Sequence, residues 1–457
     1  MPISPRSLFI VNQLSRNLLK LLRQTRRSAV QNDSLLSEAA DEQPLRAELY
    51  SIEQLERHGK LIAAVHPLAV GRSDDRLLPR LDENERVLIE TYDLVAAAAD
   101  ENRRIEPAAE WLLDNFYLIE EQIRAIRRLL PPSYSQELPQ LATGPTAGFP
   151  RVYDIALELI AHVDGRVDAA GLNGFIAAYQ SVEPLKLGEL WALPLMLRLA
   201  LIENLRRVAA RIAAARRHRD LAGTWAVRMV DVVERKPTDL ILVLADMARA
   251  NQVLSGAFVA ELTRHLQGQN PNFTFANSWL EHRLSDQGVT TEQLVRAEGQ
   301  AQAADQVSIG NSIGSLRFLI AHDWRLFVGE HSLVEQTLRS DPAGVYAEMD
   351  FATRDRYRHA VEGIARRSRL TEYEVARKAV QLAENNAREM LDARSAHVGY
   401  YLVDRGRPAL ERLAEMRLSW GVVFDKLRRR FPLICYLSLM GLFTVATLFD
   451  VTDRSPS

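Results

Sequence analysis

The sequence predicts an all-α protein: one or more multi-helical cytoplasmic domains, followed by a single C-terminal transmembrane helix. Apolar residues recur at spacings of three and four, and helix-start signals recur along the chain. Strand signals are scarce, because the flanks of the turn motifs Asp164-Gly165 and Asn173-Gly174 do not alternate in polarity. The 457 residues, 47% hydrophobic and 25% charged, are typical of a globular chain with several domains.

The composition excludes several classes of protein. The net charge of -2 argues against a chain that mainly coats nucleic acid, so no nucleic-acid partner is expected. The single cysteine, Cys435, excludes a disulfide framework within the chain and a thiolate metal cluster. A mean hydropathy of -0.15 is too polar for many membrane spans but permits one.

Residues 1–32 form a basic amphipathic N-terminal segment. Six basic residues precede the first acid, Asp33, and leucines and other apolar residues lie between them. This pattern suits a helix lying on an anionic membrane surface. A mobile tail, a helix packed on the next domain and a transit peptide are the alternatives.

A helical subdomain is expected at residues 33–130. Ser51 and Gln54 have the spacing of a capping box, which predicts a helix start. Further along, apolar side chains fall on one helical stripe at Leu112, Phe116, Ile119, Ile123, Ile126 and Leu130.

Residues 131–151 form a proline-rich connector. Five prolines occur in this stretch, and proline lacks a hydrogen-bond donor and restricts the residue before it. We therefore expect no helix to cross it, and we place a domain boundary there. Loops of this length are usually functional segments or linkers.

The main helical domain is expected at residues 152–427. Its stretch 190–202 carries one charge, Arg198, and is too short to span a membrane, so it predicts a buried core helix that Pro194 starts or kinks. Thr290 with Gln293 and Thr371 with Glu374 repeat the capping-box spacing, and Asp341-Pro342 also predicts a helix start. In residues 350–358, acids and bases have the spacing of ion pairs within one helix.

One internal run is strongly basic. Between residues 206 and 219 there are six arginines and no acid. The run predicts a candidate surface for anions or phosphate, formed by Arg206, Arg207, Arg211, Arg216 and Arg217. A simply solvated helix face is the alternative.

The transmembrane helix is expected at residues 431–449, from Phe431 to Phe449, a run of 19 residues without charge. The basic residues that precede the run are Lys426, Arg428, Arg429 and Arg430. By the positive-inside rule the preceding chain lies in the cytoplasm, and the short tail at residues 450–457 lies outside. A buried core helix is the alternative interpretation of the run.

The sequence lacks the common motifs of phosphate-binding, dinucleotide-binding and zinc-dependent enzymes. It contains no phosphate loop, no G-x-G-x-x-G and no H-E-x-x-H. There is no Asp-x-Asp pair, and the ten histidines are dispersed, without metal-ligand spacing. We therefore predict no catalytic residue, no metal ligand and no cofactor in this chain.

Long stretches resemble the N-terminal region of the bacterial cyclic β-1,2-glucan synthases, which are large inner-membrane glycosyltransferases. The similar stretches are residues 55–66, 111–131, 137–168, 187–209 and 309–368. The resemblance implies a family that polymerises glucose from UDP-glucose, with a divalent metal in a processive transferase module. In that family a phosphorylase-type module controls chain length, and both modules lie downstream of the matched region.

The expected function is therefore a non-catalytic, scaffolding or regulatory region of such a synthase. Its expected partners are the bacterial inner membrane and a downstream glycosyltransferase module or subunit, while contact with glucan is left open. No catalytic residue is carried over from the family, because none has a matching position. The alternatives are a tail-anchored helical interaction protein without enzymatic role and a binder of anionic ligands or nucleic acid that uses the arginine run.

Overall fold

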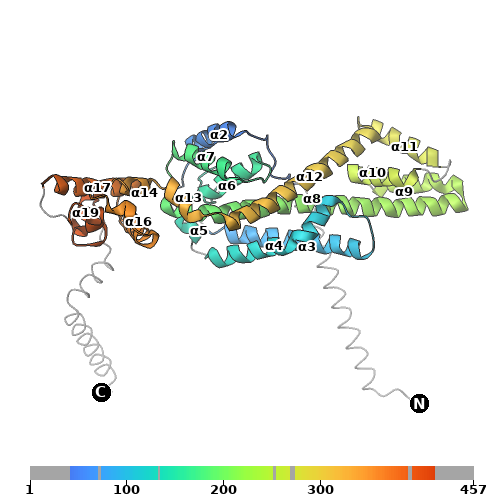
Figure 1. Cartoon of the computed structure of the whole chain (residues 1–457). Helices are drawn as coiled ribbons and strands as arrows, with labels where there is room; N and C mark the ends of the chain where they lie inside the picture. Colours follow the sequence, from blue (N-terminus) through green and yellow to red (C-terminus); the bar gives the residue numbers. More distant parts are fainter. Residues whose placement is uncertain are drawn as a thin grey trace, which may run out of the picture. The chain divides into compact units, whose positions relative to one another are not determined.

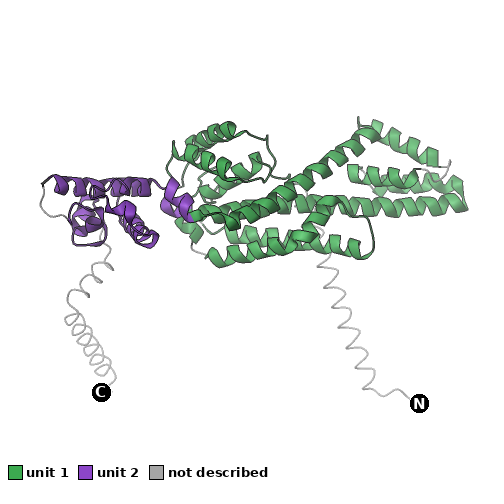
Figure 2. Cartoon of the chain, in the orientation of Figure 1, with its two compact units in different colours: residues 1–184, 191–324 green, residues 185–190, 325–457 purple. Residues whose placement is uncertain are grey.

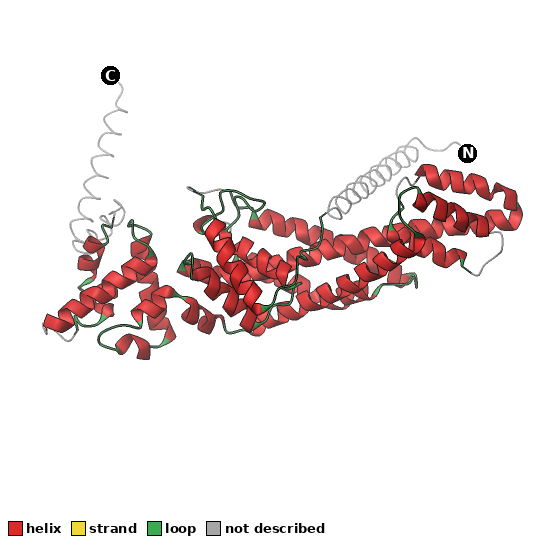
Figure 3. Ribbon diagram, turned by 90° about the horizontal axis from the view of Figure 1, so that it is seen from above, coloured by secondary structure: helices red, strands yellow, loops and turns green. Residues whose placement is uncertain are grey.

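The computed structural model describes residues 42–69, 71, 74–131, 134–250, 254–267, 273–389 and 394–416. These residues form helices and connecting loops without a β-strand, which confirms the predicted all-α class (Figure 3). Two isolated bridges, Leu68 with Leu141 and Gln140 with Pro150, are the extended pairings in the described part.

The predicted membrane segments fall outside the described residues. These segments are the basic N-terminus at 1–32, the basic residues at 426–430, the uncharged run at 431–449 and the tail at 450–457. Among the helices that the structure describes, none combines the length and the apolar character needed to cross a bilayer. Anchoring by the C-terminal run therefore stays a prediction.

The chain divides into two compact units (Figure 2). The first unit contains residues 1–184 and 191–324, and the second contains residues 185–190 and 325–457. The division expected at residues 131–151 stays a prediction.

The helices of the first unit, with one short 3-10 turn η1, are α2 (Ile52–Val65), α3 (Leu77–Asp100), α4 (Pro107–Leu129), α5 (Tyr134–Glu137), α6 (Arg151–His162), α7 (Ala169–Gln180), α8 (Leu187–Arg235), η1 (Pro237–Asp239), α9 (Leu240–Ala250), α10 (Gly256–Leu266), α11 (Thr274–Ser285) and α12 (Thr291–Ala321).

The long helix α8 is the main element of the first unit, although its first residues belong to the second (Figure 1). Its 49 residues extend roughly 70 Å at about 1.5 Å per residue. The weakly charged stretch 190–202 is almost entirely buried, as predicted for a core helix, and Pro194 lies inside the helix. Farther along, Ala210 and Ala213 pack against Val87 of α3 in a small apolar cluster.

Helix α12 connects several parts of the first unit. It packs against α4, α10 and α11. Polar contacts join it to α8, because the Asn204 amide nitrogen donates to the hydroxyls of Ser308 at 3.0 Å and Ser312 at 3.1 Å. These buried contacts fix the rotation of α12 about its own axis relative to α8.

Local start signals predicted three helices correctly. The capping boxes at Ser51 and Thr290 are both formed and begin α2 and α12. At α17 (Glu372–Glu389), the Thr371 hydroxyl accepts from the Glu374 amide, and the Glu374 carboxylate accepts from the Thr371 amide. Each pair satisfies two backbone donors that the first helical turn leaves open.

The predicted helix start at Asp341-Pro342 is wrong. The next helix, α15 (Val345–Glu348), begins after Gly344. The Asp341 carboxylate instead accepts from the amide of Val398 at 2.9 Å and contacts His397 Nδ1 at 2.7 Å. Asp341 also accepts from the amide of Tyr346 in α15 at 3.3 Å, so it still contacts the first turn of that helix, but Pro342 lies outside the helix.

The proline-rich segment 131–151 contains no long helix, as its prolines predict. Helix α4 ends at Leu129, α5 has four residues, and α6 begins at Arg151. Backbone hydrogen bonds connect the segment to the loop after α2, since the Ala69 amide donates to the Gln140 carbonyl at 2.8 Å. The segment therefore packs on the first unit.

The second unit is a small helical bundle. After α13 (Trp324–His331), whose first residue belongs to the first unit, its helices are α14 (Leu333–Leu338), α15, α16 (Phe351–Ala365), α17, α18 (Val398–Val403) and α19 (Arg407–Leu413). Its core contains Tyr346, Val361, Val375 and Leu402, all fully buried. The Glu335 carboxylate lies fully buried beside this core.

Candidate functional site

The candidate anionic surface lies along α8, and its arginines have acidic neighbours within the chain. Arg206 and Arg207 both pair with Glu203. The remaining pairs are Arg211 with Asp305, Arg216 with Asp220, and an electrostatic interaction of Arg217 with Glu90. Because their charges are already matched, these arginines attract an added anion less than the sequence alone suggests. Anion binding by this surface stays a prediction.

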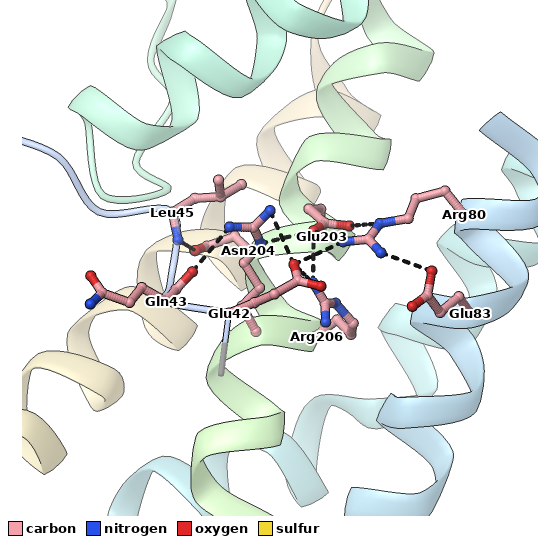
Figure 4. A network of polar contacts seen from close by, with 9 residues as sticks. Glu42, Gln43, Leu45, Arg80, Glu83, Glu203, Asn204 and Arg206 are labelled. Carbon is pink, nitrogen blue, oxygen red and sulfur yellow. Dashed lines mark hydrogen bonds and ion pairs between the residues drawn. The ribbon is translucent and has the colours of Figure 1, made fainter. Parts of the chain in front are cut away.

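The densest group of charges surrounds Glu203, which is nearly fully buried (Figure 4). Its Oε1 accepts from Arg80 at 2.7 Å, from Arg206 at 2.8 Å and from Arg207 Nε at 2.8 Å. Its Oε2 accepts from Arg80 Nε at 2.9 Å. Both oxygens of this carboxylate are therefore held by guanidinium groups.

Two more glutamates complete this group, which we call the Glu203 cluster: Glu42, Arg80, Glu83, Glu203, Arg206 and Arg207. The Glu42 carboxylate accepts from Arg206 at 2.6 Å and from Arg80 at 3.0 Å, while Glu83 accepts from Arg80 at 2.8 Å (Figure 4). The three positive and three negative charges balance. A neutral cluster, in which every charged group has an opposite charge beside it, allows charged groups to be buried, although Nε and Nη1 of Arg206 have no hydrogen-bond partner.

The sequence places these groups by helical spacing. Glu203, Arg206 and Arg207 lie at positions i, i+3 and i+4 of α8, on one face of that helix. Arg80 reaches them from the first turn of α3, and Glu42 comes from the segment before α2. The cluster therefore ties three separate segments of the chain together.

The electrostatics of the cluster favour its charged forms. Burial alone would raise the pKa of Glu203, but the hydrogen bond from Arg80 and the charges of Arg206 and Arg80 hold that pKa far below its usual range. Burial likewise opposes the charge on Arg80, yet Glu203 raises the pKa of Arg80 well above its ordinary value. Both groups stay charged at any physiological pH.

A cavity of about 500 Å³ lies beside the cluster. It has charged walls from Arg76, Arg80, Arg86, Glu83, Glu203 and Arg207, and aromatic walls from Phe149 and Tyr153, whose ring centroids are 5.4 Å apart. Charged donors next to aromatic faces suit a ligand rich in hydroxyl groups or a small anion.

A second cavity, of about 730 Å³, is lined by residues of α8, α10 and α12. Asp305 faces it with the side chains of Arg46, Arg211, His218 and Glu298. Burial raises the pKa of Asp305 to about 6 in spite of Arg211 and Arg46, and burial lowers the pKa of His218 in spite of Glu298. At Asp305 the effect of burial on the pKa therefore outweighs that of the two neighbouring arginines.

The second unit has its own buried carboxylate. Glu335 accepts from the hydroxyl of Tyr346 at 2.7 Å, from Arg358 at 3.0 Å and from Arg354 at 2.9 Å. Burial and this contact with Glu335 raise the pKa of Tyr346 above its ordinary value. The sequence pattern at 350–358 had suggested pairs within one helix. One such pair forms, between Arg358 and Asp355. Arg354 and Arg358 also both pair with Glu335, which lies on a different helix.

The sequence predicted the arginines of the candidate anionic surface but not the acidic side chains that pair with them. One signal was present: Glu203 is the single acidic residue between Leu190 and Arg219, and it stands three and four positions before Arg206 and Arg207. The contribution of Glu42 and Arg80 has no local signal, because these residues are more than a hundred positions away in the sequence.

Comparison with known proteins gives one informative similarity. No family model matches the chain. Over 372 residues, 80% of its length, the chain is 32% identical to the cyclic beta-(1,2)-glucan synthase NdvB of Rhizobium meliloti (strain 1021). The match covers 13% of that synthase. This similarity confirms the resemblance noted in the sequence.

Proposed function

Because this chain is related to a region of a cyclic β-(1,2)-glucan synthase, we propose that it is a non-catalytic scaffolding or regulatory region of such an enzyme. The observation that carries the proposal is the similarity over 80% of the chain. The synthase activity, with glucose supplied by UDP-glucose, is assigned to modules outside this chain.

The arrangement of charges supports a scaffolding role. The arginines of α8 that the sequence offered as a binding surface are paired within the first unit, and the Glu203 cluster joins three segments. Paired buried charges demand a specific geometry and so rigidify the elements that carry them. A stiff helix of 49 residues suits a part that holds other modules in position.

We assign the chain to the cytoplasmic face of the bacterial inner membrane. The uncharged run 431–449 is the proposed anchor, and the basic residues before it would keep the bulk of the chain in the cytoplasm. A glycosyltransferase module, with its own divalent metal, is the proposed partner at that membrane.

A replacement experiment tests the role. The region of the Rhizobium meliloti synthase that matches this chain is deleted, and this chain is supplied in its place by fusion or by co-expression. Membranes are then assayed for incorporation of glucose from UDP-glucose into cyclic glucan. We expect the deletion to abolish synthesis and this chain to restore part of it.

Two controls sharpen the result. The purified chain alone must transfer no glucose, since transfer would contradict the non-catalytic role. A chain carrying Glu203→Gln tests whether an intact first unit is needed for restoration. If the deletion leaves synthesis unchanged, the scaffolding role is wrong, and the tail-anchored interaction protein becomes the better description.

A further inference from the structure

Three side chains suited to binding a metal ion converge in the first unit. They are His58 of α2 with Glu158 and His162 of α6, and their donor atoms all lie within 4.8 Å of one another. His58 Nε2 lies 2.8 Å from Glu158 Oε2, and His162 Nε2 lies 3.6 Å from the same oxygen. Two imidazoles and one carboxylate are a common ligand set for zinc.

The tautomer of His162 leaves a lone pair directed at this group. His162 Nδ1 lies 2.8 Å from the backbone carbonyl oxygen of Glu48. Since a carbonyl only accepts, Nδ1 carries the proton, and Nε2 of the neutral ring is an acceptor. At 3.6 Å, Nε2 and the carboxylate oxygen are too far apart for a hydrogen bond. Glu158 Oε2 is already in hydrogen-bond contact with His58 Nε2 at 2.8 Å, so a cation bound by all three side chains would take the place of that hydrogen bond and would also satisfy His162 Nε2.

The surroundings hold the rings in place. The ring of Tyr50 stacks on His162 with centroids 3.9 Å apart and an interplanar angle of 8°, and His58 meets His162 edge to face at 4.5 Å. A ligating histidine whose second nitrogen donates to a carbonyl is the usual arrangement around zinc. The outer partner expected of a ligating histidine is therefore already formed at His162.

Burial and access also fit an ion. The side chains of His58 and His162 are 18% and 9% exposed, so competing water is limited. His162 and Tyr50 also line a cavity of about 390 Å³. His58 and Glu158 do not line this cavity, and the Glu158 side chain, 37% exposed, gives an ion and a water ligand access from solvent.

We propose that His58, Glu158 and His162 bind a zinc ion that joins α2 to α6, with a water molecule in the fourth position. Zinc accepts nitrogen and oxygen ligands in a tetrahedral set, and three protein ligands leave one position open. The sequence had suggested no metal site, because His58 and Glu158 stand one hundred positions apart and only the fold brings them together.

Titration of the metal-free 457-residue chain with Zn²⁺ tests the proposal. Calorimetry should give one zinc per chain, and zinc should raise the melting temperature, since a ligand that binds the folded state stabilises it. His58→Ala, His162→Ala and Glu158→Gln should each weaken zinc binding by at least about 10-fold, because even loss of an outer partner costs about 10–100-fold.

His66→Ala is the matched control. His66 joins the end of α2 to Asp154 of α6 at 3.1 Å and to Tyr179 of α7 at 3.0 Å, but it lies outside the three ligands. This variant should lose some stability and keep zinc affinity. Each variant is compared with its own metal-free form, and Glu158→Gln preserves the side-chain shape if an alanine variant folds poorly.

Three results would overturn the proposal. One is a wild-type chain that takes up no stoichiometric zinc. Another is zinc affinity that is equal in the wild type and in Glu158→Gln. The last is an equal loss of zinc affinity in His66→Ala, which would show that binding follows general stability and not these ligands.

Discussion

The Glu203 carboxylate accepts hydrogen bonds from three guanidinium groups on its two oxygens. Desolvating these charges costs several kcal/mol per ion, and the cost is offset only while every partner is present. The loss of stability caused by a substitution at Glu203 therefore depends on which buried arginine charges lose their partner.

We expect Glu203→Gln to lower the free energy of unfolding by about 3–5 kcal/mol, because Arg206 remains buried and loses one of its two carboxylate partners. Urea unfolding of the protein, followed by the loss of its helical circular dichroism signal, measures this change in the free energy of unfolding. The control is Glu292→Gln, which breaks the exposed pair with Arg296 and should change little. Equal effects of the two variants would contradict a special role for Glu203.

Asp305 should make the stability of the first unit depend on pH. Its pKa is raised from 3.8 to about 6 in the folded protein, so the folded state holds the proton more tightly than the unfolded state does. Stability from this group is therefore present below about pH 4 and is lost as the pH rises towards about 6.

Asp305→Asn removes that dependence. Relative to the wild type, the variant should gain stability as the pH is raised from about 4 to about 7, measured as the difference between their urea midpoints. Other titrating groups contribute equally to both proteins and cancel. A difference that stays constant with pH would mean that Asp305 has an ordinary pKa.

Among single residues, local signals succeeded where the partner is near in sequence. The spacing of Glu203 with Arg206 and Arg207 is readable from the chain. Two other contacts cannot be predicted from local spacing: that of His58 with Glu158, and the hydrogen bond from the Val398 amide to Asp341. Each depends on segments that only the fold brings together.

At the scale of helices, the starts were predicted well because caps act within one turn. The boxes at Ser51 and Thr290 form as the spacing indicates. The burial of 190–202 also follows from its composition, since a helical stretch that is apolar on all sides except for Arg198 needs an apolar environment. No local pattern predicted that α12 packs against α4, α10 and α11. Which helices pack together depends on the arrangement of all the helices in the unit.

The cap of α12 gives a direct test at this scale. Thr290→Ala should destabilise the protein by about 0.5–2 kcal/mol, because the Gln293 amide loses its acceptor. Amide hydrogen exchange in the first turn should become faster. Thr290→Ser retains the hydroxyl and should behave nearly as the wild type. If serine and alanine are equally destabilising, the hydroxyl is not the cap.

For the whole molecule, attachment to the membrane is the property to measure. Removal of residues 431–457 should release the expressed chain from bacterial membranes, because the run 431–449 has the length and apolar character of a spanning helix. Removal of residues 1–32 should leave a fraction that high salt does not extract, since surface attraction is screened and insertion is not. A full-length chain that salt alone releases would contradict the anchor.

The Glu203 cluster also limits how this chain can be recombined with its relatives. Its charges come from residue 42, from residues 80 and 83, and from residues 203 to 207. A crossover inside that interval would join segments from two parents and could leave a guanidinium group facing no carboxylate. Exchanges made before residue 42 or after residue 207 keep the six residues from one parent, and libraries built there should contain more folded members.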